Sequence, residues 1–386
     1  MIGKAIKFFL GIFMIISALF NDAVAQLIDT KASIETQTLY KNIGKNVGKG
    51  IMFGHQDDLA YGVNWKYEPG RSDIKDVVGD YPAVYGWDIG GIEHGNKENL
   101  DKVPFEKIKS YIKEVYQRGG INTISWHLDN PVSLGSSWET TKAVAEILPN
   151  GKLHQKYLLW LDRVAIFLNA LETEEGIKIP ILFRPFHELN GPWFWWGKTH
   201  CTSQEYIDLW RLTVQYLRDK KQLHHLIYVF NTNSFKDKEE FLERYPGDNY
   251  ADMLSFDVYQ FAKSNASKED LQKSSIQFQE QLKNNLRVLT EEAKTRNKPA
   301  ALAETGFEAI PDASWWTGTL FPAIKDFPIS YVLVWRNHGL NAENKMHYYA
   351  PYKGQKSASD FKKFYKLSQI LFQKEVKKLN LYKIKP

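Results

Sequence analysis

The chain has 386 residues, of which 43% are hydrophobic and 25% are charged, so it can bury a full core, and its composition excludes a disordered chain or a repeat array. The formal net charge of +5 is too small to indicate nucleic-acid binding. Aromatic residues make up 14% of the chain, more than packing alone usually requires, which suggests flat binding surfaces.

The N-terminus has the pattern of a signal peptide, which we place at residues 1–26. Lys4 and Lys7 precede an apolar run at residues 8–20, and residues 23–25 (Ala-Val-Ala) offer a small-residue cleavage site. The apolar run is shorter than the roughly 20 residues that a bilayer span needs. We therefore expect the chain to be exported and this segment to be removed.

A single cysteine, Cys201, limits the covalent chemistry of the chain. It excludes an internal disulfide, and no cysteine lies near the predicted cleavage site to carry a lipid anchor. We expect a soluble periplasmic or secreted protein that acts as a monomer, without insertion into the membrane after cleavage.

Eight apolar runs rich in β-forming residues follow the signal peptide and alternate with amphipathic, charged segments. The runs lie at residues 50–54, 82–87, 121–126, 179–183, 226–231, 253–258, 299–303 and 330–335. The clearest amphipathic segments lie at residues 105–118, 157–172, 203–220, 270–296 and 360–379. Apolar residues recur in these segments at three- and four-residue spacing, as in helices that cover a core.

Eight strand-helix units predict an α/β protein of the (β/α)8 TIM-barrel class. No linker rich in Pro, Gly or Ser divides the chain, so we predict one domain at residues 27–386. The segments after the second, third and eighth strands, residues 90–104, 128–152 and 337–356, are long enough to form enlarged loops at the C-terminal face.

Polar residues follow each of the eight runs, as expected for a barrel whose active site lies at the C-terminal ends of its strands. In chain order they are His55-Gln56-Asp57-Asp58, Asp88, His127 with Asn130, His187 with Glu188, Asn231-Thr232-Asn233, Asp257 with Tyr259, Glu304, and Trp335-Arg336-Asn337-His338.

Glu188 and Glu304 stand apart because each follows an apolar run, where a charge has no place unless it faces the barrel mouth. Paired carboxylates across a barrel mouth fit glycoside hydrolysis, with one as acid/base and the other as nucleophile. Glu188 precedes a loop crowded with aromatic residues, an environment that would keep its proton. We therefore predict Glu188 as the acid/base and Glu304 as the ionised nucleophile.

Several short blocks, in barrel order along nearly the whole mature chain, together resemble glycoside hydrolase family 26. They are Trp126-His127 with Asn130-Pro131, Arg184-Pro185-Phe186-His187-Glu188 with Gly191, Trp193-Phe194-Trp195-Trp196-Gly197, Ala303-Glu304-Thr305-Gly306 and Val334-Trp335-Arg336. The resemblance implies a retaining endo-β-1,4-mannanase that acts on mannan, galactomannan and manno-oligosaccharides.

The same resemblance implies Glu188 as acid/base and Glu304 as nucleophile, and it assigns a binding shell. It implies that His187 forms hydrogen bonds near the acid/base and that His127 and Trp335 line the subsite where the bond breaks. Trp193 would contact the leaving side, and Tyr259 would orient the nucleophile. Arg336 and Trp138 are weaker assignments to neighbouring subsites.

The same residues also admit other interpretations. Among the tryptophans we expect at least one to be core, with Trp195 the first candidate. Asp88 and Asp257 could support the catalytic residues or cap loops, and His94 with its neighbours Glu93 and Asn96 could wall the sugar groove. Metal-ligand spacing and glycine-rich phosphate loops are missing from the sequence, so we expect no metal and no cofactor.

Three alternatives to an internally cutting β-mannanase also stay open. A family relative could act on β-1,3-xylan or mixed-linkage β-glucan with the same two glutamates. The barrel could bind carbohydrate without catalysis, although both glutamates are intact. The enlarged loops could also restrict the enzyme to trimming short units, such as mannobiose, from a chain end.

Overall fold

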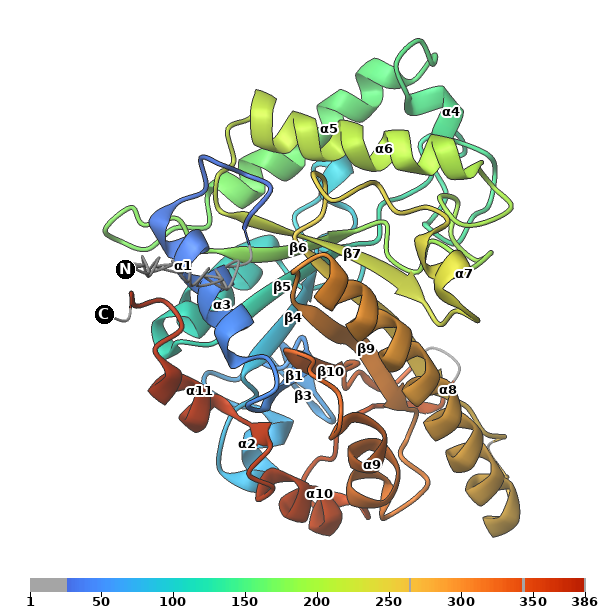
Figure 1. Cartoon of the computed structure of the whole chain (residues 1–386). Coiled ribbons are helices and arrows are strands. Elements are labelled where there is room, and N and C mark those ends of the chain that lie inside the picture. Colours follow the sequence, from blue (N-terminus) through green and yellow to red (C-terminus); the bar gives the residue numbers. More distant parts are fainter. Residues whose placement is uncertain (1–25, 264, 342–343, 385–386) are drawn as a thin grey trace, which may run out of the picture.

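Eight parallel strands close into a barrel at the centre of the computed structural model, which describes residues 26–263, 265–341 and 344–384 (Figure 1). In order around the barrel they are β1 (Ile51–Gln56), β4 (Val84–Asp88), β5 (Ile121–Trp126), β6 (Ile181–Pro185), β7 (Leu226–Asn233), β8 (Met253–Gln260), β9 (Ala300–Phe307) and β10 (Tyr331–Val334). Pairing of Met52 with Tyr331 joins β1 to β10 and closes the ring. Each strand overlaps one of the eight predicted runs, so the predicted (β/α)8 barrel is confirmed.

The strands are apolar on both faces because the barrel has a filled interior and an outer layer of helices. Along β7, Ile227 and Val229 pack in the inner cluster, whereas Tyr228 and Phe230 pack in the outer one. The inner cluster also contains Leu39 and other residues of α1 (Ile34–Asn46), which therefore covers the N-terminal end of the barrel. The opposite, C-terminal end of the barrel is therefore the end that is available for an active site.

Helices surround the barrel (Figure 1). After α1 the chain forms α2 (Asp73–Val78), η1 (Ile92–His94), α3 (Phe105–Arg118), α4 (Val144–Ile147), α5 (His154–Asn169), α6 (Ser203–Gln215) continued by the π-helix η2 (Tyr216–Lys220), α7 (Lys238–Leu242), α8 (Lys268–Thr295), the π-helix η3 (Trp315–Leu320), α9 (Phe321–Ile324), α10 (Ala358–Tyr365) and α11 (Gln373–Leu379). Four of the five predicted amphipathic segments correspond to α3, α5, α6 with η2, and α8. Within the described residues, no helix is both long and apolar enough to cross a membrane.

The fifth predicted segment, residues 360–379, is not one continuous stretch. It contains most of α10, the short strand β13 (Ile370–Leu371) and α11. β13 pairs in parallel with β1, and the neighbouring Phe372 stacks on Phe53 with ring centroids 4.8 Å apart. Tertiary pairing and ring packing therefore override the helical periodicity of this segment.

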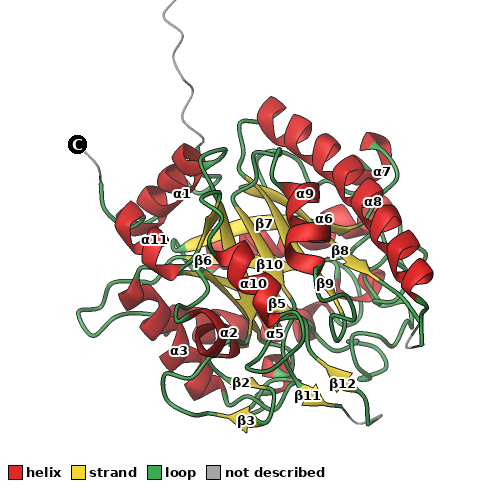
Figure 2. Ribbon diagram, turned by 90° about the horizontal axis from the view of Figure 1, so that it is seen from below, coloured by secondary structure: helices red, strands yellow, loops and turns green. Residues whose placement is uncertain are grey.

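Two antiparallel pairs lie side by side in the loops beyond the strand ends (Figure 2). They are β2 (Tyr61–Gly62) with β3 (Trp65–Lys66), after β1, and β11 (Gly339–Leu340) with β12 (Met346–His347), after β10. The rings of Tyr61 and His338 contact each other edge to face, 5.9 Å apart. The Asn337 amide donates to Asp73 Oδ2 at 2.8 Å, which further ties the two loops together.

The predicted signal peptide, residues 1–26, lies outside the described residues except for Gln26. Export and cleavage therefore stay predictions.

Replacing Phe53 by Ala should destabilise the barrel. The Phe53 side chain is fully buried against the rings of Phe372, Phe361 and Trp316. A cavity there should reduce the free energy of unfolding by roughly 3–5 kcal/mol, measured by urea denaturation. The matched control is Phe261→Ala, because the Phe261 ring is 80% exposed and its loss should change stability by less than about 0.5 kcal/mol. Equal effects of the two substitutions would contradict this account of the core.

Candidate active site

A buried arginine joins two carboxylates at the C-terminal end of the barrel. Arg184 Nη1, on β6, donates to Asp257 Oδ2 on β8 at 3.0 Å, and Arg184 Nη2 donates to Glu304 Oε1 on β9. Asp257 and Glu304 lie opposite each other in the β8–β9 pairing, just after a bulge in its register. All three side chains are buried, so the guanidinium compensates carboxylate charge that would otherwise be costly to remove from water.

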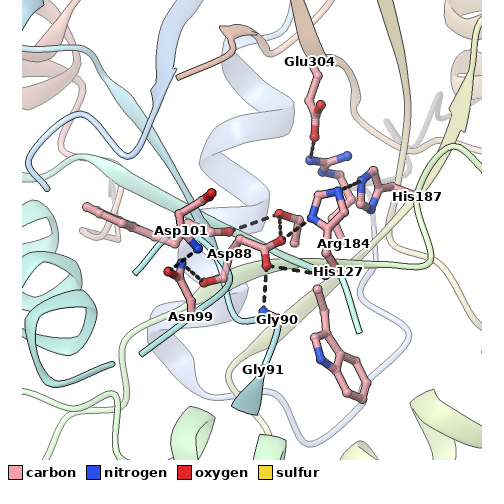
Figure 3. Close-up of polar contacts among 12 residues, drawn as sticks. Asp88, Gly90, Gly91, Asn99, Asp101, His127, Arg184, His187 and Glu304 are labelled. Atoms are coloured by element: carbon pink, nitrogen blue, oxygen red, sulfur yellow. Dashed lines mark hydrogen bonds and ion pairs between the residues drawn. The ribbon is translucent and has the colours of Figure 1, made fainter. Parts of the chain in front are cut away.

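Two further donors fix these carboxylates. The Tyr259 hydroxyl donates to Glu304 Oε2 at 2.7 Å, so both oxygens of Glu304 accept hydrogen bonds. The Asn231 amide donates to Asp257 Oδ2 at 2.7 Å. Glu304 therefore has a defined orientation before any ligand arrives. Figure 3 shows the Glu304 carboxylate pointing at the Arg184 guanidinium.

Glu188 reaches the same site from the loop after β6. Its backbone and that of Phe186 have positive φ angles of 54° and 50°, which are uncommon for residues other than glycine. The Glu188 backbone N–H donates to the Asn231 carbonyl at 3.0 Å, which helps to hold this turn. Its side-chain Oε2 accepts a 2.6 Å hydrogen bond from Trp193 Nε1. Backbone strain is thus used to direct a carboxylate into the site.

The tryptophan block places one side chain beside Glu188 and buries two others in the core. Trp193 is half-buried beside Glu188, and a Cβ atom on Gly191 would lie 2.3 Å from its ring, so only glycine fits there. Trp195 and Trp196 are fully buried, and their indole N–H groups donate to the carbonyls of Leu128 and His187. The prediction that Trp195 is core is confirmed, and Trp196 is core as well.

Burial among these groups raises the pKa of Glu188 to about 7, and the negative charge of Glu304 adds to the effect. The Trp193 hydrogen bond and the His127 and Arg184 charges oppose it. Carboxylate oxygens of Glu188, Asp257 and Glu304 lie within 4.8 Å of one another. One carboxyl group that holds a proton near neutral pH therefore faces one that is held by cationic and hydroxyl donors.

Two histidines line the site beside Glu188. His127 follows β5 and His187 follows β6, and their Nε2 atoms are 3.1 Å apart. His127 Nδ1 also lies 2.7 Å from Asp88 Oδ2, at the end of β4. Asp88 therefore both supports a site histidine and caps its own loop, where it accepts the Gly90 N–H at 2.7 Å.

Aromatic rings continue from this histidine pair. Trp138, which is 49% exposed, stacks on the His127 ring at 5.2 Å, and Trp335 contacts it edge to face at 6.3 Å. Phe194 lies against both Trp138 and His127, at 5.4 Å from each ring. The site thus has an aromatic wall next to its carboxylates, in which Trp138 and His127 lie nearly parallel, and exposed aromatic faces suit the faces of sugar rings.

Arg336, which the sequence assigned to a neighbouring subsite, forms an ion pair with Asp101. The contact joins the end of β10 to the loop after β4, residues 90–104, which is one of the three loops predicted to be enlarged. Glu93 was considered above as part of the groove wall. Its side chain is buried and accepts hydrogen bonds from the N–H groups of Gly91, Trp126 and Asp129. Its carboxylate therefore fixes a loop.

The sequence prediction did not include Arg184, Asn231, Phe194 or Asp101 among the site residues. Arg184 had a detectable signal, because a charge directly after the apolar run 179–183 needs a buried partner. Asn231 had one as well, because it is among the polar residues at the strand ends. Phe194 and Asp101 carry no such signal, because each acts through a contact with a residue distant in the sequence.

The chain is similar to known proteins that are named as mannanases. A family model described as glycosyl hydrolase family 26 matches residues 28–298. The solved structure of a GH26 beta-mannanase from Bacteroides ovatus is 48% identical, with a TM-score of 0.84 over 91% of this chain and 98% of that one. A mannan endo-1,4-beta-mannosidase of Bifidobacterium adolescentis is 32% identical over 362 residues, which are 89% of this chain and 35% of that protein. A mannan endo-1,4-beta-mannosidase of Bacillus subtilis is 33% identical over 200 residues, 48% of this chain and 52% of that protein. The chain thus spans a third to a half of the length of the latter two relatives.

Replacing Glu304 by Gln should lower the pKa of Glu188. Gln keeps the shape and the burial of the site but removes the negative charge that helps to raise this pKa. A carboxyl-carbon NMR titration of Glu188 measures the change. The control is Glu280→Gln on the exposed face of α8, which should leave the Glu188 titration in place. An unchanged or higher pKa in the Glu304 variant would show that the two carboxylates are not coupled.

Proposed function

Because the chain belongs to glycosyl hydrolase family 26, we propose that it is a retaining glycoside hydrolase that cleaves β-1,4-mannosidic bonds in mannan and galactomannan by double displacement. The observation that carries the mechanism is the spacing of Glu188 and Glu304, whose nearest oxygens lie within 4.8 Å. Retaining enzymes place their two carboxyl groups roughly 5–5.5 Å apart, whereas inverting ones need roughly 6.5–9.5 Å to admit water.

In the first step Glu304 attacks the anomeric carbon while Glu188 gives its proton to the leaving oxygen. The carbon–oxygen bond of the leaving sugar breaks, and an ester to Glu304 forms. In the second step the ionised Glu188 takes a proton from water, and the resulting hydroxyl oxygen displaces Glu304. The raised pKa of Glu188 supports its role as the acid, because its proton remains available near neutral pH.

Arg184 and Tyr259 are suited to hold Glu304 in its attacking orientation. Each donates to a different oxygen of this carboxylate, so the side chain does not have to be ordered when substrate binds. Their donors also stabilise the carboxylate when it is released from the ester in the second step.

The arrangement of rings supports the binding roles that the family resemblance implies. We propose that His127 and Trp335 line the subsite where the bond breaks, and that Trp193, which touches the acid, contacts the leaving side. His187 lies against His127, and Trp138 extends the aromatic wall. Arg336, held by Asp101, would serve a neighbouring subsite. The mannanase names of the relatives support mannan as substrate.

Variants that lack one or the other glutamate should form glycosyl azides of opposite anomeric configuration when azide is added. Glu188→Ala and Glu304→Ala should each lose at least about 10²-fold in kcat/KM on mannan, measured by reducing-sugar release. With an aryl β-mannoside that has a good leaving group, Glu188→Ala still forms the ester, and azide should then yield β-mannosyl azide. In Glu304→Ala, azide enters in place of the missing carboxylate and should yield α-mannosyl azide. NMR of the anomeric centre distinguishes the products.

The matched control for this pair is Glu280→Gln, an exposed glutamate of α8, which should keep full activity. Exchanged stereochemistry between the two alanine variants would reverse the assigned roles. Unchanged mannan hydrolysis in both variants would refute catalysis at this site.

Substrate preference can be tested separately from mechanism. Galactomannan and manno-oligosaccharides should be hydrolysed with a higher kcat/KM than β-1,3-xylan or mixed-linkage β-glucan. The similar proteins are named as mannanases, which favours mannan as the substrate. The two carboxylates alone do not distinguish one sugar from another, so the substrate preference depends on the binding contacts. A higher rate on xylan or glucan would reject the mannan assignment and leave the double-displacement mechanism in place.

A further inference from the structure

Asp88 is a buried carboxylate whose position is explained only in part by its loop. It lies at the end of β4 with 1% of its surface exposed. Oδ1 accepts the Gly90 N–H, and Oδ2 accepts the Ser125 hydroxyl and faces His127 Nδ1, each at 2.7 Å. Figure 3 shows His127 between Asp88 and His187. A carboxylate with this many donors stays ionised, and these contacts hold its pKa low against the effect of burial.

The contact between the two histidines restricts where protons can be. Two imidazole nitrogens 3.1 Å apart form a hydrogen bond only if one carries a proton and the other does not. His127 Nδ1 must carry a proton, because it faces an acceptor-only carboxylate. A neutral His127 then has a bare Nε2 and accepts from His187. A cationic His127 donates from Nε2, and His187 is the neutral acceptor.

The surrounding charges select the cationic form of His127. The charged and titratable groups that face the pair are Asp88 from β4, Glu188 from the loop after β6, Glu304 from β9, and Arg184 from β6. Burial opposes a charge on His127, but the three carboxylates outweigh it and raise its pKa. Burial, His127 and Arg184 all lower the pKa of His187 far below its ordinary value, so His187 is the neutral partner. Arg336 and Asp57 bear on Asp88 itself.

We propose that Asp88 is a positioning residue that keeps His127 cationic, and that this cation sets the pH range in which the Glu188 and Glu304 pair works. The inference rests on the proposed function of the two glutamates. Asp88 itself touches neither glutamate and acts through His127.

The cation suits both halves of a double displacement. Before the first step Glu304 is ionised and Glu188 carries the proton. In the ester intermediate Glu304 is neutral and Glu188 is ionised. Of the two glutamates, one is therefore negative at each stage, so the fixed positive charge of His127 stabilises both states without having to move.

Loss of the His127 cation should raise the pKa of Glu188. The His127 charge lowers the pKa of Glu188, against burial and the Glu304 charge, which raise it. Without the cation this pKa rises, so the acid keeps its proton to higher pH and the basic limb of the activity profile moves up. A merely structural loss would act in the opposite direction, because looser packing admits water to Glu188 and removes part of the burial that raises its pKa.

The test is the Asp88→Asn variant. Its pH profile of kcat/KM on manno-oligosaccharides is measured, and His127 and Glu188 are titrated by NMR. The Asn carbonyl can still accept hydrogen bonds but carries no charge. We expect the basic limb and the Glu188 titration to move to higher pH, and the His127 titration to move to lower pH. A profile of reduced height with its basic limb unmoved, or moved down, would overturn the proposal.

Two further variants keep the test decisive if Asp88→Asn folds poorly. Ser125→Ala removes a hydrogen bond to the same Oδ2 atom without removing charge, so its basic limb should stay in place whatever its height. His127→Gln removes the cation while Asp88 remains, so it should shift the Glu188 titration upward as Asp88→Asn does. A Glu188 titration unchanged by His127→Gln would contradict the proposal. If the wild-type chain hydrolyses no glycan, the proposed function fails, and the two NMR titrations still test the Asp88–His127 coupling.

Discussion

The site depends on one buried cation, the Arg184 guanidinium, held between Asp257 and Glu304. Removing such charges from water costs several kcal/mol per ion, and only close pairing offsets this cost. Three strands, β6, β8 and β9, contribute the three side chains, so the pairing is possible only where the barrel brings their C-terminal ends together. A closed barrel with a filled interior is rigid enough to keep these groups in register.

Around that cation, the two glutamates experience opposite environments. Glu304 is held by a guanidinium and a phenol, whereas Glu188 is set in a turn with positive φ and covered by an indole. Chemically identical groups thereby acquire different tasks, as acid/base catalysis requires. His127, paired with Asp88, contributes a second positive charge near Glu188, and this charge limits how far the pKa of Glu188 can rise.

Much of the fold could be predicted because its signals are local. Each strand is an apolar run of β-forming residues, and helices such as α3 show clear apolar periodicity, so their places in the chain could be recognised. The segment at residues 360–379 could not, because β13 forms only by pairing with β1 and Phe372 packs on Phe53. Its helical periodicity was real, but a distant strand offered stronger pairing.

By itself, the sequence determined the barrel class, the two glutamates and the aromatic loop, because a charge after an apolar run and a dense run of tryptophans are legible without neighbours in space. Only the tertiary structure decided how these residues act. It brought Glu188 within 4.8 Å of Glu304, buried Trp195 and Trp196 while leaving Trp193 on the acid, and placed Asp88 against His127. Distances, burial and the pKa shifts that follow from them are properties of side chains from different strands, and no single stretch of sequence contains them.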